Sequence, residues 1–130
     1  RRAADQTGRA QIDAHAAEAF RLVVEGAGGL MVPLNKRYLI LDLVQQLGLE
    51  VVLVSRNYLG SINHTLLTYD ALRNRNVYIA GIVFNGPPNP PTESIILKHT
   101  NLPVILRVND EEELDKAMVK RYAKLVELDR

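Results

Sequence analysis

Short apolar runs alternate along the chain with segments in which apolar residues recur at helical spacing. Runs of this kind, rich in β-branched residues and bounded by turn residues, are typical of buried strands in a parallel sheet. The predicted strands are residues 22–24, 51–55, 77–84 and 103–108, and the predicted helices are 11–20, 38–47, 62–75, 92–100 and 110–128. This alternation predicts an α/β fold with parallel strands and right-handed crossovers.

Several residues mark where the predicted elements begin and end. Gly48 is expected to end the second helix as a C-cap, and Ser61, Thr92 and Asp110 are expected to cap the amino ends of the three helices that follow. The stretch 85–91 reads Asn-Gly-Pro-Pro-Asn-Pro-Pro, which predicts a rigid loop without regular structure.

Length and composition narrow the class of protein. The 130 residues fit one domain, 1–130, and a hydrophobic fraction of 47% is enough for a real core. Sixteen Lys and Arg against 15 Asp and Glu give a net charge of +1, which does not favour a nucleic-acid partner. The absence of cysteine excludes disulfides and thiolate metal sites.

Two further observations concern location and completeness. No apolar run approaches the roughly 20 residues that span a bilayer, and no signal peptide is visible, so a cytoplasmic protein without a membrane partner is expected. The first residue is Arg1 rather than Met, and no strand precedes it, so a portion of a longer protein is expected.

The first candidate site lies where the predicted strand 22–24 ends in an acid and a glycine-rich turn. Glu25 comes directly after the strand, and Gly26, Gly28 and Gly29 follow. Ligands of open parallel sheets bind beyond the carboxyl ends of the strands. Glycines leave amide donors open to a phosphate, and a carboxylate can hold the accompanying Mg²⁺. The alternative is a tight turn with a solvated acid.

Two more loops follow predicted strands and are expected to share this edge of the sheet. The first leads into a helix start at Ser61, Ile62 and Asn63, where free amides and the helix dipole can bind an anion such as a carboxylate; ordinary capping is the alternative. The second begins at Asn85, whose amide offers the donor and acceptor that suit a purine edge; the alternative is a turn residue preceding Gly86.

Four motifs resemble dethiobiotin synthase: Val-Glu-Gly-Ala-Gly-Gly at 24–29, Val-Pro-Leu at 32–34, Leu-Gly-Ser-Ile-Asn-His-Thr-Leu-Leu-Thr at 59–68 and Gly-Ile-Val-Phe-Asn at 81–85. Their order and spacing fit from about residue 13 to residue 108. The resemblance implies a parallel-sheet, P-loop-NTPase-like (Rossmann-like) three-layer α/β domain. It also implies a homodimeric, ATP- and Mg²⁺-dependent cyclo-ligase of biotin biosynthesis, which carboxylates 7,8-diaminononanoate with CO₂ to form the ureido ring of dethiobiotin.

The resemblance assigns roles to individual residues. It implies that Glu25 coordinates magnesium or binds ATP, and that the substrate carboxylate of a neighbouring subunit binds at the helix start beginning with Ser61. The residues implied to bind ATP are Glu25, Gly26, Ala27, Gly28, Asn85, Gly86 and Asn109, and those implied to bind substrate are Ser61, Ile62 and Asn63. Asn109 lies in the family's last nucleotide-contacting loop, although the usual proline-containing pattern is absent there.

One departure from the family is large. The sequence has no G-x-x-x-x-G-K-[ST] phosphate loop and no lysine in the setting of the family's catalytic lysine. The chain therefore resembles an N-terminally truncated, C-terminal portion of a synthase, with no catalytic residue of its own and no turnover alone. Two alternatives stay open: a non-catalytic binding or dimerisation module, and a cobyrinate-synthetase-type relative, against which the 62–64 helix start argues.

Overall fold

The structure is a computed structural model that describes residues 10–12 and 22–126. The chain divides into two compact units, Arg1–Leu49 and Glu50–Arg130, and each unit is described by itself. The single domain expected from the length of the chain stays a prediction. The expected helix 11–20 lies mostly outside the described residues, as does the expected end of the closing helix.

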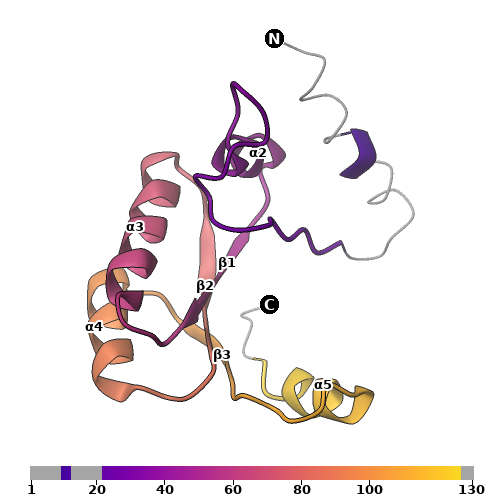
Figure 1. Cartoon of the computed structure of the whole chain (residues 1–130), viewed down its shortest axis with the longest axis vertical. Helices are drawn as coiled ribbons and strands as arrows, with labels where there is room; N and C mark the ends of the chain where they lie inside the picture. The colour runs from indigo at the N-terminus through magenta and orange to yellow at the C-terminus, as the bar shows by residue number, and fades with distance from the viewer. Residues whose placement is uncertain (1–9, 13–21, 127–130) are drawn as a thin grey trace. The chain divides into compact units, whose positions relative to one another are not determined.

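The second unit contains a three-stranded parallel sheet in the order β1-β2-β3 (Figure 1). The strands are β1 (Val51–Arg56), β2 (Ile79–Asn85) and β3 (Val104–Val108). The crossovers are α3 (Ser61–Asn74) and α4 (Pro90–Thr100), and α5 (Lys116–Ala123) follows the last strand. The α/β fold with parallel strands that the sequence predicts is confirmed.

The core of this unit lies between the sheet and the two crossover helices. Helices α3 and α4 pack side by side along one side of the sheet (Figure 1). Leu72 of α3, Ile82 of β2 and Ile96 of α4 are completely buried. Ser55 of β1 bonds the buried Thr65 of α3 through their hydroxyl oxygens, 2.8 Å apart, which fixes the helix on the strand. The apolar residues that the sequence places in strands and helices thus form the contact between them.

Alternate residues of β1 face away from this core. Val52 and Val54 are 45% and 64% exposed, whereas Leu53 and Ser55 between them are buried. The period of two follows from the pleat of a strand.

The start of α4 corrects two expectations about the proline-rich stretch. Pro90 and Pro91 form the first turn of the helix, and Asn89 rather than Thr92 is the N-cap. The Asn89 side-chain oxygen accepts a hydrogen bond from the Thr92 amide at 3.3 Å. Prolines fit here because the first helical amides have no partner within the helix.

The last helix begins later than the sequence predicts. Its N-cap is Asp115, whose carboxylate accepts a hydrogen bond from the Met118 amide at 2.7 Å. Asp110, the expected cap, instead pairs with Arg56 of β1 at 3.0 Å. The side chain of Asp110 is therefore engaged with a residue distant in sequence, a partner that local capping preference does not reveal.

The first unit confirms one predicted helix and corrects one predicted strand. Helix α2 (Ile40–Leu47) ends at Gly48, which has the left-handed conformation of a C-cap, as expected. Residues 22–24 do not form a strand, and Val23 is 91% exposed. A strand needs a neighbour that accepts its ladder hydrogen bonds, and within the described residues no strand pairs with this segment. None of the helices in the described residues is long and apolar enough to cross a membrane.

Candidate functional site

The glycine-rich turn of the first unit presents an acid and several open amides. Glu25 is exposed, and the structure gives the amides of Gly26, Ala27 and Gly28 no hydrogen-bond partner among the described residues. Gly28 has φ +83°, and a Cβ there would lie 2.9 Å from Val32 Cγ2. A side chain at Gly28 would therefore be strained and would clash, so the turn requires glycine. Open amides of this kind can donate to a phosphate.

The residues present fit one kind of metal site and not another. The described part of the chain holds no group of three or more His, Cys, Asp or Glu that could enclose a metal ion. Mg²⁺ is often held by one or two carboxylates together with substrate phosphates and water. The lone exposed Glu25 fits that mode, in which a nucleotide supplies the other ligands.

The carboxyl ends of the three strands of the second unit meet at one edge. Arg56 pairs with Asn85 in register, and Asn85 pairs with Val108. The Gly86 amide donates to the Val108 carbonyl at 2.7 Å. The expected convergence of the loops after β1 and β2 is confirmed. Glu25 belongs to the other unit, so its place beside them stays a prediction.

The first turn of α3 has a different N-cap from the one predicted, but it still presents amide donors at the helix start. The N-cap is Gly60, with φ +95°, so the expected capping role of Ser61 is wrong. Ser61 is the first helical residue and is 2% exposed, and its hydroxyl has no hydrogen-bond partner within the described part of the chain. The amides of Ile62 and Asn63 also have no partner among the described residues, and no acid occupies the first turn. These donors, together with the helix dipole, can bind an anion.

The segment that leads into α3 is held by its own residues. The Tyr58 hydroxyl lies 2.6 Å from Nδ1 of His64, and the Tyr58 carbonyl accepts from the Ser61 amide at 3.0 Å. Leu59 between them is fully exposed. The first turn of α3 is therefore fixed by local contacts, because Tyr58 contacts both its first residue and the residue one turn later.

Asn85 stands at the end of β2 with its side-chain amide available. The residue is half-buried, and in the described part of the chain no hydrogen-bond partner is found for its side chain. Gly86 has φ +92°, and a Cβ there would lie 3.2 Å from the Arg56 Cζ. The positive φ favours glycine here, and a larger residue would also require the Arg56 guanidinium to shift.

The loop after β3 carries Asn109. Its amide donates to the Tyr122 hydroxyl at 3.1 Å, and that hydroxyl in turn donates to the Glu111 carboxylate at 2.5 Å. The hydrogen bond from Tyr122, followed by that from Arg121, lowers the pKa of Glu111. The Asn109 backbone is thus held by α5, although the sequence gives no sign of this contact.

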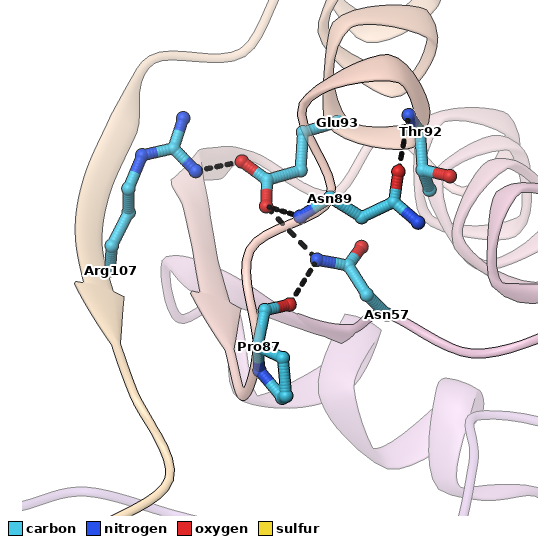
Figure 2. Close-up of polar contacts among 6 residues, drawn as sticks. All are labelled: Asn57, Pro87, Asn89, Thr92, Glu93 and Arg107. Atoms are coloured by element: carbon cyan, nitrogen blue, oxygen red, sulfur yellow. Dashed lines mark hydrogen bonds and ion pairs between the residues drawn. The ribbon is translucent and has the colours of Figure 1, made fainter.

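Glu93 is an acid in the first turn of α4, and the residue is almost fully buried, with 4% of its surface exposed. Figure 2 shows that it accepts hydrogen bonds from the Asn89 amide (3.0 Å), from Asn57 Nδ2 (2.9 Å) and from Arg107. Asn57 Nδ2 also donates to the Pro87 carbonyl at 3.1 Å. We refer to Asn57, Pro87, Asn89, Glu93 and Arg107 as the Glu93 network.

Burial and hydrogen bonding act in opposite directions on Glu93. Burial raises its pKa, but the hydrogen bonds from Asn89 and Asn57 and the charge of Arg107 outweigh burial and hold the pKa below its ordinary value. The side chain therefore stays ionised. An acid four residues after an asparagine that precedes two prolines was the available signal in the sequence, and it indicates a helix start without indicating the partners on β1 and β3.

Comparison with known proteins connects this geometry to a family. A family model described as "AAA domain" matches residues 1–118. The ATP-dependent dethiobiotin synthetase BioD of Cytophaga hutchinsonii is 55% identical over 102 residues, which are 78% of this chain and 50% of that protein. The protein of the same name from Christiangramia forsetii is 51% identical over 102 residues, 78% of this chain and 49% of its own length.

A longer relative carries the same match. The biotin biosynthesis bifunctional protein BioCD of Bordetella avium is 44% identical over 106 residues, 82% of this chain and 23% of that protein. The chain spans about half the length of the two dethiobiotin synthetases that it resembles.

Proposed function

The chain belongs to the AAA domain family, and from this premise we propose that it is the nucleotide- and substrate-binding portion of an ATP-dependent dethiobiotin synthetase. The reaction would be the carboxylation of 7,8-diaminononanoate with CO₂ to close the ureido ring, in a homodimer. The observation that carries the proposal is the 55% identity to a protein of that name over 102 residues. The convergence of the loops after β1 and β2 at one sheet edge supports it.

Within this function, the glycine-rich turn would serve the nucleotide phosphates. The open amides of Gly26, Ala27 and Gly28 would donate to phosphate oxygens. Glu25 would hold Mg²⁺, which neutralises phosphate charge when it is bound. At the other nucleotide positions, the Asn85 side chain would read the adenine edge, with Gly86 leaving room beside it. Asn109, whose backbone is held by Tyr122, would contact the nucleotide from the loop after β3.

The start of α3 would bind the carboxylate of the diamine substrate. That carboxylate is separated by a methylene chain from the amines that react, so a separate anion site is needed. The amides of Ile62 and Asn63 and the Ser61 hydroxyl, for which the described residues supply no partner, provide donors for it. In the proposed homodimer this site would receive the substrate held by the neighbouring subunit.

The proposal is tested with a chimera in which this chain replaces the 102 matched residues of the C. hutchinsonii synthetase. We expect dethiobiotin formation that depends on ATP, with the intact relative as the positive control. A chimera that folds, judged by circular dichroism, and forms no dethiobiotin would refute the proposed reaction.

Asn63→Asp in the chimera tests the anion site. Asn63 is exposed, and the substitution is isosteric, so it adds a negative charge where the substrate carboxylate would bind. An acid in the first turn favours the helix dipole, so a loss of binding would not come from loss of the helix. We expect the KM for the diamine to rise about tenfold or more, with the KM for ATP unchanged.

The matched control is Asn74→Asp, which adds the same charge at the other end of α3. It should leave both KM values unchanged. An equal effect of the two substitutions on the diamine would place the substrate carboxylate elsewhere.

A second candidate function rests on the absence of a G-x-x-x-x-G-K-[ST] motif from the sequence. Without that phosphate loop and its lysine, the chain alone would act as a binding or dimerisation module without turnover. Assay of the chain by itself tests the module: ATP hydrolysis or dethiobiotin formation by the isolated chain would contradict it.

A further inference from the structure

We propose that the Glu93 network is a positioning device that holds the Asn85 amide in place to read a nucleotide base. The inference rests on the proposed function, because that function assigns the base to Asn85. Glu93 itself does not touch the nucleotide in this proposal. It acts through the loop between β2 and α4, residues 85–89.

The loop is held at several of its backbone groups. Asn85 is paired on both sides, with Arg56 of β1 and Val108 of β3. The Gly86 amide donates to Val108, and the Pro87 carbonyl accepts from Asn57. Prolines at 87 and 88 carry no amide hydrogen and fix their own φ angles. These bonds restrain the loop, while the described residues provide no hydrogen-bond partner for the side-chain amide of Asn85.

Glu93 joins this loop to the elements on either side of it. One carboxylate oxygen accepts from the Asn89 amide at the end of the loop and from Asn57 in the loop after β1. The other oxygen accepts from Arg107 of β3, whose guanidinium also lies 5.0 Å from the centre of the Phe84 ring in β2. Figure 2 shows the Asn57 and Arg107 side chains and the Asn89 backbone amide directed toward the carboxylate from three segments. One buried anion therefore sets the relative positions of all three.

The orientation of Asn57 supports a role in positioning. Its amide nitrogen donates to two acceptors, Glu93 and the Pro87 carbonyl, so a rotated amide would place its oxygen against a carboxylate and a carbonyl. In the orientation that it adopts, Asn57 Oδ1 is buried and has no partner among residues 10–12 and 22–126. Such an atom is unfavourable in a purely structural contact, and here it accompanies two bonds that fix the loop.

A neutral amide cannot replace the carboxylate. All the groups that face Glu93 are donors: a backbone amide, the Asn57 amide and the Arg107 guanidinium. Glu93→Gln would keep the size of the side chain but turn an amide hydrogen toward one of these donors. The loop would then lose at least one of its attachments to Glu93, either directly at Asn89 or through Asn57, and the backbone that follows Asn85 would be less firmly held.

The test uses two measurements on Glu93→Gln. The first is hydrogen exchange of the Asn89 and Gly86 amides in the whole 130-residue chain, which needs no activity. The second is the KM for ATP and for the diamine in the active chimera. We expect faster exchange at both amides, a KM for ATP raised about tenfold, a diamine KM changed less than about twofold, and weaker discrimination of ATP from GTP.

Two further variants keep the result interpretable. Glu113→Gln makes the same chemical change at an exposed glutamate and should alter nothing. Asn57→Ala removes two hydrogen bonds of the network while leaving the Glu93 contacts with Arg107 and Asn89, so it decides the question if Glu93→Gln does not fold. It should raise the KM for ATP in the same direction.

The outcomes separate this proposal from the one on which it rests. Unchanged exchange at Asn89 and Gly86, or a loss of kcat/KM that is equal for ATP and diamine, would overturn the positioning role. An inactive wild-type chimera would instead overturn the proposed function. Faster exchange together with an effect confined to ATP supports the positioning role and is not expected of a residue that only stabilises the fold.

Discussion

At the scale of single residues, backbone conformation decides which positions of the glycine-rich turn tolerate change. Gly28 and Gly29 are neighbours in sequence but differ in surroundings. Gly28 has a positive φ, and Val32 lies against the position of a Cβ, whereas Gly29 has open space there. The pair therefore offers a matched comparison within one turn.

We predict that Gly28→Ala destabilises the turn and that Gly29→Ala does not. A non-glycine residue in the left-handed region costs about 1–2 kcal/mol, to which the contact with Val32 adds. Gly29→Ala should stay within about 0.5 kcal/mol of the parent. Urea unfolding of the two variants and the parent checks the difference, and equal stabilities would show that Gly28 does not adopt this conformation in solution.

At the scale of elements, the second unit depends on the packing of α3 and α4 against the sheet. Leu72 of α3 is completely buried, while Leu67 on the same helix is 59% exposed. The two leucines have the same chemistry and the same helical propensity, so a comparison of them isolates burial.

We predict that Leu72→Ala lowers the free energy of unfolding by about 2–5 kcal/mol, because it removes buried methyl groups and leaves a cavity. Leu67→Ala should change it by less than about 1 kcal/mol, since an exposed side chain loses little on truncation. Thermal and urea denaturation followed by circular dichroism give both values. A cost for Leu67→Ala as large as that for Leu72→Ala would mean that the outer face of α3 is covered in solution.

At the scale of the whole molecule, the buried charge of Glu93 links stability to pH. Burial raises its pKa. The pKa is nevertheless lowered in the folded chain, because the hydrogen bonds from Asn89 and Asn57 and the charge of Arg107 outweigh burial. The unfolded chain therefore binds the proton more readily than the folded chain on acidification. The stabilising contribution of this carboxylate is present above the unfolded pKa of about 4.3 and is lost as the pH falls through the lower, folded value.

We predict that the parent is more stable than Glu93→Gln at pH 7, by about 1–3 kcal/mol, the range for a buried polar contact that is lost. The difference should shrink as the pH falls below about 4.3. Urea unfolding at a series of pH values, with Glu113→Gln as the control, measures it. A difference that stays constant down to the lowest pH would show that Glu93 is not the group responsible.

The sequence by itself determined the order of elements, the parallel α/β class, the ends of α2 and β1, and the two motif-bearing loops that meet where β1 and β2 end. These follow from local patterns: apolar periodicity, β-branched runs and glycine at a C-cap. Tertiary structure alone decided that 22–24 does not form a strand, that Asp110 pairs with Arg56 instead of capping a helix, and that Glu93 joins three segments. Each of these depends on a partner distant in sequence, and a local pattern carries no information about which donor or strand the fold will bring to it.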